Sequence, residues 1–326
     1  LSLEPVADRM RALLEPTPVR FVDDLAGDEA NSAVESLAPG EIVLLQNTRF
    51  WPGEKANDAE LSRAVASLAD VYVDDAFGAA HRAHASTVGI PEAVREAGRP
   101  AVAGMLVERE LRFLGEALES PDRPFIAILG GAKISGKIDA IEHLLPRADR
   151  LLIGGAMANT FLLALGLETG ESLVEPDRVE MARDLLERAA DELVLPVDCV
   201  IETADEATTL VERDSVPGDG AIMDIGPKSV HVFRDFLAGA GTILWNGPMG
   251  VFEDERFRAG TDGVARAVAD ATAAGATSVV GGGDTASATR LAGLTDAMSH
   301  VSTGGGASLA LLEGRTLPGI AALSDR

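Results

Sequence analysis

The stretch FIAILGGAKISGKIDAIEHLL (residues 125–145) decides the fold, because an apolar run, a glycine-rich turn and a helical pattern follow one another directly. A short apolar run bounded by glycine is typical of a buried strand. Ile138, Ile141 and Leu145 recur with the period of one helix face. A strand that passes into a helix through a glycine turn is half of a βαβ unit. The stretch therefore predicts an α/β fold with a mainly parallel sheet.

The octet GAKISGKI (131–138) fits the phosphate-binding P-loop pattern G-x-x-x-x-G-K-[ST] at every position but the last. Ile138 stands where a hydroxyl group would hold magnesium, so a P-loop NTPase is disfavoured. A nicotinamide dehydrogenase is also disfavoured, because no G-x-G-x-x-G opens a first βαβ unit. A different kind of phosphate site remains.

The same alternation of apolar runs and amphipathic patterns continues along the chain and predicts further βαβ units. The expected strands are VRFV (19–22), IVLL (42–45), VYV (71–73), FIAIL (125–129), RLLIG (150–154), AIMDI (221–225), TILW (242–245) and SVVG (278–281). A helical segment over 102–119, followed by the breaker SPDRP, separates a smaller N-terminal region from a larger C-terminal one.

Composition narrows the class of protein. The chain has 326 residues, which favours two domains, and 52 acidic against 28 basic residues give a net charge of −24. Such a charge disfavours nucleic-acid binding. The acidic residues are dispersed, which predicts a salt-adapted protein such as those of haloarchaea. No apolar run is long enough to predict a membrane span.

The single cysteine, Cys199, lies in the apolar run LVLPVDCVIE. One cysteine excludes an internal disulfide framework and suits a cytoplasmic protein. We expect Cys199 to be a buried strand residue rather than a reactive thiol.

Five glycine clusters stand where an apolar run gives way to a helix or loop: GGAKISGK, GGAMAN, NGPMG, GGGDT and GGGAS. In open α/β sheets ligands bind beyond the carboxyl ends of the strands, and glycine lets backbone N–H groups approach them. A helix start adds unpaired donors that suit phosphate. One such cluster is readily a tight turn, but five favour a phosphorylated ligand.

Three charged residues in these clusters sharpen this reading. Lys133 and Lys137 lie at the start of a predicted helix, where cations oppose the helix dipole unless an anion is bound. Both also fit a solvated helix face. Asp284 begins another helix, and it is either an N-cap or a magnesium contact.

The N-terminal region carries basic residues at two strand ends. Arg49 follows IVLL, and His81, Arg82 and His84 follow VYV. Arginine binds carboxylate or phosphate through a planar set of donors, although each arginine alone also fits a surface ion pair. No third ligand completes a metal site with the two histidines.

Taken together, seven motifs resemble the phosphoglycerate kinase family, in family order and over nearly the whole chain. They are LLQNTRF, VYVDDAFGAAHRAHAS, ILGGAKISGKIDAI, LLIGGAMANTFL, ILWNGPMGVFE, VVGGGDTASA and HVSTGGGASLALLEGRTLPGIAAL. The resemblance implies two Rossmann-like domains with mainly parallel sheets, joined by a hinge helix. It also implies reversible magnesium-dependent phosphoryl transfer between 1,3-bisphosphoglycerate and ADP, giving 3-phosphoglycerate and ATP.

The resemblance assigns a role to each matching residue. Arg49, Arg82, His81 and His84 are expected to bind phosphoglycerate, and Lys133, Lys137 and Gly305 to act on the transferring phosphoryl group. Asp284 is expected to position Mg²⁺. The expected nucleotide site comprises Gly131, Lys133, Lys137, Gly155, Leu173, Met223, Val251, Glu253, Gly282, Gly283, Asp284 and Thr285.

The resemblance also implies an organisation of the chain. We expect a partial phosphoglycerate-binding domain over 1–104, an interdomain helix over 105–120 and a nucleotide-binding domain over 121–308. A segment over 309–326 is expected to return toward the N-terminal domain. We further expect a cytoplasmic monomer with no nucleic-acid or membrane partner.

The sequence departs from the family pattern in two places. Two early family motifs do not occur, which predicts that roughly two βα units, about 60–80 residues, precede Leu1 in the natural protein. On that expectation the N-terminal sheet has an open edge, and this chain alone has little or no kinase activity. An inactive nucleotide-binding fragment or paralogue is then the alternative. The second departure, Gly136 in place of a polar residue, is expected to loosen the turn before Lys137.

Overall fold

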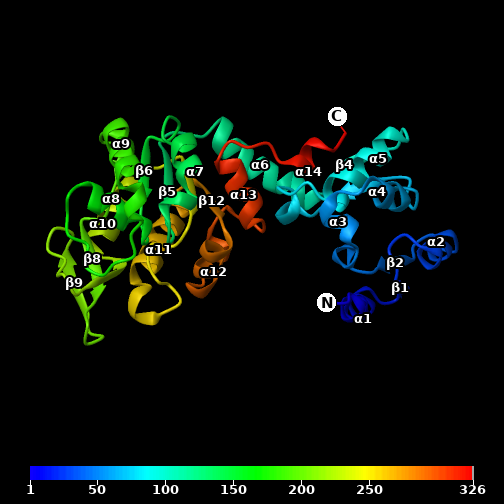
Figure 1. The fold of residues 1–326 in the computed structure, drawn as a ribbon, viewed down its shortest axis with the longest axis horizontal. Helices are drawn as coiled ribbons and strands as arrows, with labels where there is room; N and C mark the ends of the chain where they lie inside the picture. The colour runs from blue at the N-terminus through cyan, green and yellow to red at the C-terminus, as the bar shows by residue number, and fades with distance from the viewer. Residues whose placement is uncertain (325–326) are drawn as a thin grey trace. The chain divides into compact units, whose positions relative to one another are not determined.

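The computed structural model describes residues 1–324 and divides into two compact units (Figure 1). Unit 1 comprises Leu1–Glu108 and the chain from Thr316 onward, and unit 2 comprises Arg109–Arg315. The first boundary falls inside helix α6 (Met105–Glu119). The second falls after helix α13 (Gly305–Leu312) rather than at residue 308, so the whole of this apolar helix belongs to unit 2, where it contacts α7 (Ile138–Leu144).

Unit 2 is built on a six-stranded parallel sheet with the order β13-β12-β11-β5-β6-β7. Its strands are β5 (Phe125–Leu129), β6 (Arg150–Ile153), β7 (Leu193–Val194), β11 (Thr242–Asn246), β12 (Thr277–Gly281) and β13 (His300–Val301). The parallel arrangement that the sequence predicted is confirmed, with small differences in the strand ends.

Both faces of this sheet are covered. Ile126 and Ile128 of β5 pack into a cluster with Phe233 of α10 (Pro227–Leu237) and Val264 of α11 (Ala259–Ala273). The alternate strand residues, including Leu129, are equally buried. The remaining α-helices of unit 2 are α8 (Met157–Ala164), α9 (Val179–Ala189) and α12 (Gly283–Leu291).

The strand order places a topological switch point between β5 and β11. From β5 the chain first adds β6 and β7 on one side, and later adds β11, β12 and β13 on the other. Open α/β sheets bind ligands in the crevice beyond the carboxyl ends at such a point. The loops that begin at Gly130 and Gly247 meet there.

A second, antiparallel sheet in unit 2 was not predicted. It has the order β10-β8-β9, from β8 (Asp198–Glu202), β9 (Thr208–Glu212) and β10 (Ala221–Ile225). The sequence predicted β10 but missed β9, because most of the residues of β9 are exposed and carry no strong apolar signal. Cys199 is a buried residue of β8, as predicted, and burial raises the pKa of its thiol to about 12.

Unit 1 holds two separate pairs of parallel strands, β1-β2 and β3-β4. Its strands are β1 (Val19–Val22), β2 (Ile42–Leu45), β3 (Tyr72–Asp74) and β4 (Ala101–Ala103), and its α-helices are α1 (Glu4–Leu14), α2 (Asp28–Glu35), α3 (Pro52–Ala56), α4 (Ala59–Ala66), α5 (Ile90–Glu96) and α14 (Pro318–Ala321). Within residues 1–324, each of these strands pairs with one neighbour.

The C-terminal segment packs against unit 1. The N–H of Gly319 donates to the Ala80 carbonyl at 2.9 Å, and Leu323 joins a buried cluster with Ile90 and Val94. Residues 325–326 of the predicted returning segment lie outside the described part of the chain.

One sequence prediction was wrong in detail. Residues 102–104, assigned to the helix, form the end of β4 and a turn, because pairing with β3 outweighs local helical propensity; Gly104 N–H donates to the Asp74 carbonyl at 2.7 Å. Of the two readings of Asp284, the N-cap is excluded, because Gly282 holds that position in α12 and the helix has no side-chain cap. Among residues 1–324, no helix combines the length and apolar character that crossing a bilayer requires.

Candidate active site

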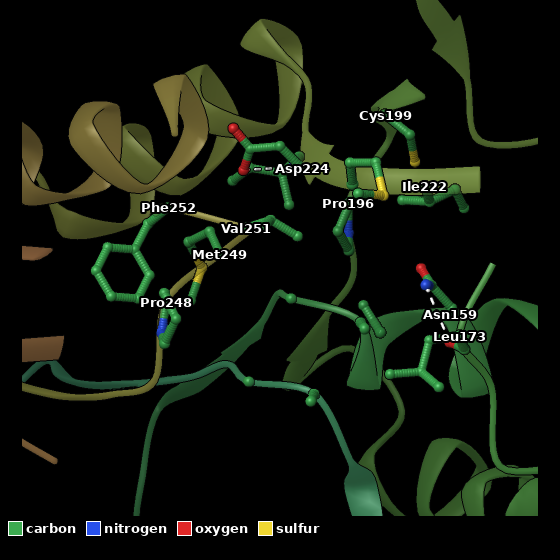
Figure 2. A pocket seen from close by; sticks show the side chains of 18 of the residues that line it. Asn159, Leu173, Pro196, Cys199, Ile222, Asp224, Pro248, Met249, Val251 and Phe252 are labelled. Atoms are coloured by element: carbon green, nitrogen blue, oxygen red, sulfur yellow. Dashed lines mark hydrogen bonds between the residues drawn. The ribbon is translucent and has the colours of Figure 1, made fainter. Parts of the chain in front are cut away.

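A cavity of about 460 Å³ opens in unit 2 between the loops that follow β5, β6 and β11 and the second sheet. Figure 2 shows Asn159 and Leu173 across the cavity from Met249 and Val251, with Cys199 near Pro196 and Ile222. Of the predicted nucleotide residues, seven line it: Gly131, Gly155, Leu173, Met223, Val251, Glu253 and Asp284.

The walls of the cavity expose apolar side chains. Leu173 is 51% exposed and Val251 is 39% exposed, although both are large hydrophobic residues. Hydrogen bonds hold the backbone of each wall: Asn159 Nδ2 donates to the Leu173 carbonyl at 3.2 Å, and Val251 N–H donates to the Met223 carbonyl at 2.9 Å. Paired apolar walls of this kind suit a flat aromatic ligand.

A buried carboxylate supports the wall that carries Met223. Asp224 is 2% exposed, and its oxygens accept N–H groups of Ile225 at 2.9 Å and Gly260 at 2.6 Å. Burial raises the pKa of Asp224 to about 7, against the opposing effect of those hydrogen bonds. A register shift of β10 lies between Ile222 and Asp224, and such bulges redirect side chains next to sites.

The glycines of the clusters fall into two groups. At Gly155, with φ +67°, a Cβ atom would lie 2.5 Å from the Gly131 nitrogen, so this glycine allows neighbouring loops to pack closely. Gly131 and Gly283 instead face open space, because a Cβ atom on either would have no other group within 4 Å. The second group leaves room for a ligand beside the backbone.

Lys137 lies at the switch point between β5 and β11. Its ammonium group contacts the Asn246 Oδ1 at the end of β11. Burial lowers the pKa of Lys137 to about 8, and the nearby carboxylates of Glu313 and Asp284 partly oppose this effect. The Asp284 carboxylate is thus close enough to Lys137 to raise the pKa of its ammonium group.

Asn246 is a polar residue that the sequence patterns did not single out. Its side chain is 2% exposed, and its Nδ2 has no hydrogen-bond partner among the described residues. That atom lies over the backbone of Gly281 and Gly282. A polar residue at the end of the apolar run TILW was the available signal, and a buried amide donor without a partner favours an anionic ligand there.

Two helix starts lie side by side next to this point. A Cβ on Gly305, at the start of α13, would lie 3.2 Å from the Gly283 nitrogen at the start of α12. Helix starts supply unpaired N–H donors and a partial positive charge. Thr285 is fully buried, and its Oγ1 accepts the Gly247 N–H at 2.7 Å, so this side chain does not face the cavity.

The loop preceding α13 is held by a second buried acid. Glu110 of α6 accepts the Thr303 N–H at 2.7 Å and its hydroxyl at 2.8 Å, and it lies 2.7 Å from His300 Nε2. Burial alone would raise the pKa of Glu110, but these hydrogen bonds lower it.

In unit 1 two of the predicted basic residues, Arg49 and His84, lie beside a buried acid, Glu54, that the sequence patterns also did not reveal. Glu54 is 1% exposed; Arg49 Nε lies 3.6 Å and His84 Nδ1 3.9 Å from its carboxylate. Arg82 Nε donates to His81 Nε2 at 3.2 Å. Burial and the charges of Arg49 and Arg82 lower the pKa of His84, although Glu54 acts in the opposite direction.

The carboxylate of Glu54 also fixes the loop that carries the histidines. It accepts the Ser86 N–H at 2.9 Å and the Ser86 hydroxyl at 2.6 Å. Unit 1 thus presents a cluster of cationic donors on an otherwise acidic chain. Among residues 1–324, no group of three or more His, Cys, Asp or Glu side chains is arranged to hold a metal ion.

Comparison with known proteins agrees with this geometry. The family model described as phosphoglycerate kinase matches residues 1–315. The phosphoglycerate kinase of Synechococcus sp. (strain JA-2-3B'a(2-13)) is 52% identical over 330 residues, which cover 99% of this chain and 79% of the relative. That of Chlorobium limicola is 53% identical over 331 residues, covering 99% of this chain and 82% of the relative.

Solved structures show the same similarity. Phosphoglycerate kinase from Coxiella burnetii matches with a TM-score of 0.87 and 41% identity, covering 99% of this chain and 80% of that one. The enzyme from Pyrococcus horikoshii matches with a TM-score of 0.84 and 32% identity, covering 99% of this chain and 82% of that one. The matches lend no support to the expectations of a missing N-terminal part or of salt adaptation, and both stay predictions. The chain belongs to the phosphoglycerate kinase family, and it is a kinase.

Proposed function

We propose that unit 2 binds ADP or ATP in its cavity and that unit 1 binds 3-phosphoglycerate or 1,3-bisphosphoglycerate. The observation that carries the proposal is the convergence of seven of the twelve predicted nucleotide residues on one cavity, with the largely buried Lys137 close to Asp284 at its edge. These residues come from separate loops, so their convergence was not guaranteed by sequence spacing.

The adenosine portion lies between the walls of the cavity in this proposal. Leu173 and Val251 cover the two faces of the base, and burial of their exposed apolar surface stabilises the complex. Glu253, an exposed acid at the cavity edge, accepts hydrogen bonds from the ribose hydroxyls. Gly131 lets the backbone approach the sugar and the first phosphate, and Gly155 lets the loop beside it pack closely against Gly131.

The phosphates extend from the cavity toward Lys133, Lys137 and the starts of α12 and α13. The ammonium groups neutralise the phosphate charge, and the N–H groups of Gly283 and Gly305 donate to phosphate oxygens. Asn246 Nδ2, the buried donor without a partner among the described residues, supplies a further hydrogen bond.

Mg²⁺ fits this donor set. Magnesium bound to a nucleotide keeps several waters and takes one or two carboxylates, and Asp284 is an exposed carboxylate at the cavity edge near Lys137. Asp284 holds the ion in this proposal, and the ion, when bound, neutralises charge on the phosphates. Thr285 and Gly282 support this loop rather than contact the ion.

The phosphoglycerate is bound by Arg49 and Arg82, with His81 and His84 beside them. Phosphoryl transfer requires positioning and neutralisation of charge rather than a nucleophile activated by a base. The acceptor is already an ionised phosphate or carboxylate. The reversible reaction of 1,3-bisphosphoglycerate and ADP to give 3-phosphoglycerate and ATP is therefore within the chemistry of these residues.

Separate titrations of the two substrates test the proposal. Calorimetry with Mg-ADP and with 3-phosphoglycerate should each show one site, and replacing Mg²⁺ by EDTA should weaken ADP binding. Arg49→Ala should weaken 3-phosphoglycerate binding and leave Mg-ADP binding unchanged. Failure of the unmodified chain to bind Mg-ADP at millimolar concentration would contradict the nucleotide assignment.

A further inference from the structure

The segment 172–175 connects the adenosine cavity with the loop that carries Lys133 and Lys137. At its start, Ser172 Oγ accepts the N–H of Ile222 at 2.8 Å, and the Leu173 carbonyl accepts Asn159 Nδ2 at 3.2 Å. At its end, Glu175 N–H donates to Thr160 Oγ1 at 3.1 Å. The segment is thus fixed to both the second sheet and α8.

The carboxylate of Glu175 binds the centre of the lysine loop. Its Oε2 accepts the Ser135 N–H at 2.9 Å, and its Oε1 accepts the Ser135 hydroxyl at 2.5 Å. Ser135 is the middle residue of the 3-10 turn η4 (Ile134–Gly136), between the two lysines. Both oxygens of one carboxylate therefore hold one residue, which restricts the orientation of the turn.

The lysine loop needs such a restraint. Neither η4 nor α7 has a side-chain N-cap of its own. Gly136 has open space where a side chain would be, and glycine permits more backbone conformations than other residues. Lys133 and Lys137 stand on either side of this turn, so the contacts of Ser135 affect the position of both, while Asn246 also contacts the Lys137 ammonium group.

Glu175 is a negatively charged residue beside lysines that are proposed to bind phosphate. Partial burial alone would raise its pKa, but the hydrogen bonds from Ser135 and Ile134 and the charge of Lys133 lower it. The group is therefore an anion at neutral pH, close to the lysines proposed to bind phosphate. Simple electrostatics makes such a group unfavourable for phosphate binding.

We propose that Glu175 is a positioning residue that ties the Leu173 wall of the adenosine cavity to Ser135 and so sets the lysines for the phosphates. This inference rests on the proposed nucleotide site. Glu175 touches no substrate itself, and its effect is exerted through Ser135. The affinity gained because Glu175 positions the lysines is greater than the affinity lost through repulsion between its charge and the phosphates.

The experiment compares Mg-ADP with adenosine, which has no phosphate. Glu175→Ala should weaken Mg-ADP binding by about tenfold, on the order expected for loss of a charged hydrogen-bond pair. Adenosine affinity should change by less than about twofold, because Asn159 and Ser172 still hold the Leu173 wall. A general loss of structure would weaken the binding of both Mg-ADP and adenosine. A loss of Mg-ADP affinity with adenosine affinity retained therefore indicates a positioning role.

Matched variants separate positioning from charge. Asp177→Asn removes one negative charge from the same region, at a side chain that is 76% exposed and forms an ion pair with its neighbour Arg178. It should leave Mg-ADP affinity unchanged or slightly higher. Ser135→Ala should reproduce part of the loss, whereas Ser135→Thr keeps both donors and should retain binding. The double variant of Glu175 and Ser135 should be no weaker than Glu175→Ala, because both changes remove the same pair.

Each outcome decides a different claim. If the unmodified chain fails to bind Mg-ADP, the proposed function fails. If it binds Mg-ADP and Glu175→Ala binds it equally or more tightly, the positioning role is wrong and the proposed site stands. If Glu175→Ala does not fold, as judged by circular dichroism, the comparison of Ser135→Ala with Ser135→Thr decides the question.

Discussion

Lys137 combines three properties that follow from its position at the switch point of the sheet. It is mostly buried, it contacts Asn246, and burial lowers its pKa to about 8 despite Glu313 and Asp284. A buried cation without a full countercharge is unfavourable in the free protein. A bound polyphosphate removes this cost, so the electrostatics of the free protein favours binding of an anion.

The first prediction is a pH dependence of Mg-ADP affinity. Above pH 8 the free protein loses the Lys137 proton, and binding must recover it, so the association constant should fall by up to about tenfold per pH unit. In Lys137→Arg the guanidinium stays charged, and this dependence should vanish between pH 8 and 9.5. Calorimetry across this range measures it; a constant affinity of the unmodified chain from pH 7 to 9.5 would show that the Lys137 charge is not used.

The same proton has the opposite effect on stability. Because the pKa of about 8 in the folded protein is below the unfolded value of 10.5, the unfolded chain binds more protons between these values. The free energy of unfolding should therefore rise with pH in this window while Mg-ADP affinity falls. Urea unfolding of the unmodified chain and Lys137→Met at pH 8 and 9.5 separates the two effects.

Asp224 gives a second prediction at the residue scale. Burial raises its pKa to about 7, so between pH 3.8 and 7 the folded protein binds more protons than the unfolded chain. The contribution of Asp224 to the free energy of unfolding should then decrease by up to about 1.4 kcal/mol per pH unit as pH rises through this window. The difference between the unmodified chain and Asp224→Asn should follow this slope.

Trp245 provides the probe for this measurement. It is fully buried in the core of unit 2, and the only other tryptophan of the chain is Trp51. In a Trp51→Phe background, Trp245 fluorescence reports unfolding of unit 2 during urea titrations at pH 4.5, 5.5 and 6.5. A difference between the two proteins that is independent of pH would mean that Asp224 does not titrate there.

At the scale of elements, three glutamates accept the same pair of hydrogen bonds from the loops that they hold. Glu54, Glu110 and Glu175 each accept the backbone N–H and the hydroxyl of one Ser or Thr in a loop that carries candidate binding residues. Each acid comes from a different element than the loop it holds. The loops at the carboxyl ends of strands are thus fixed from outside, which lets them carry glycine without losing their shape.

Glu54 allows this geometry to be tested in unit 1. Glu54→Gln removes a negative charge from an anion-binding cluster, yet it should weaken 3-phosphoglycerate binding about fivefold, because Gln replaces one acceptor by a donor facing Ser86. Glu60→Gln, at an exposed position of α4, is the matched change of charge. Calorimetric titration of both variants checks this, and tighter binding by Glu54→Gln would show that its charge matters more than its contacts.

The sequence predicted individual strands better than it predicted which strands pair and which side chains hold the loops. The apolar run FIAIL gave a strand with the observed ends, because a strand that is buried throughout excludes polar residues. AIMDI also gave the observed ends, although it contains the buried Asp224. The short strand β4 and the exposed strand β9 exist through pairing with neighbouring strands, which no local pattern records. The glycine clusters and lysines pointed to the cavity, but the acids that hold their loops act across 32 to 193 residues of chain and were missed.

At the scale of the whole molecule, the net charge of −24 predicts a response to salt. Repulsion between dispersed acidic groups destabilises the folded chain, and salt screens it. The melting temperature should therefore rise between 0.1 and 2 M KCl. Chloride is preferable to sulfate, because sulfate stabilises folded proteins of any charge. A higher melting temperature in low salt would contradict salt adaptation.

The central claim is that the cavity of unit 2, with Lys137 and Asp284 at its edge, binds the magnesium nucleotide. Its most direct test is calorimetric titration of Mg-ADP into the unmodified chain, Lys137→Ala and Asp284→Ala at pH 7. We expect a single site in the unmodified chain and at least roughly tenfold weaker binding in both variants, with Asp284→Ala losing its difference from the unmodified chain when EDTA replaces Mg²⁺. Equal affinity of all three proteins for Mg-ADP would contradict the claim.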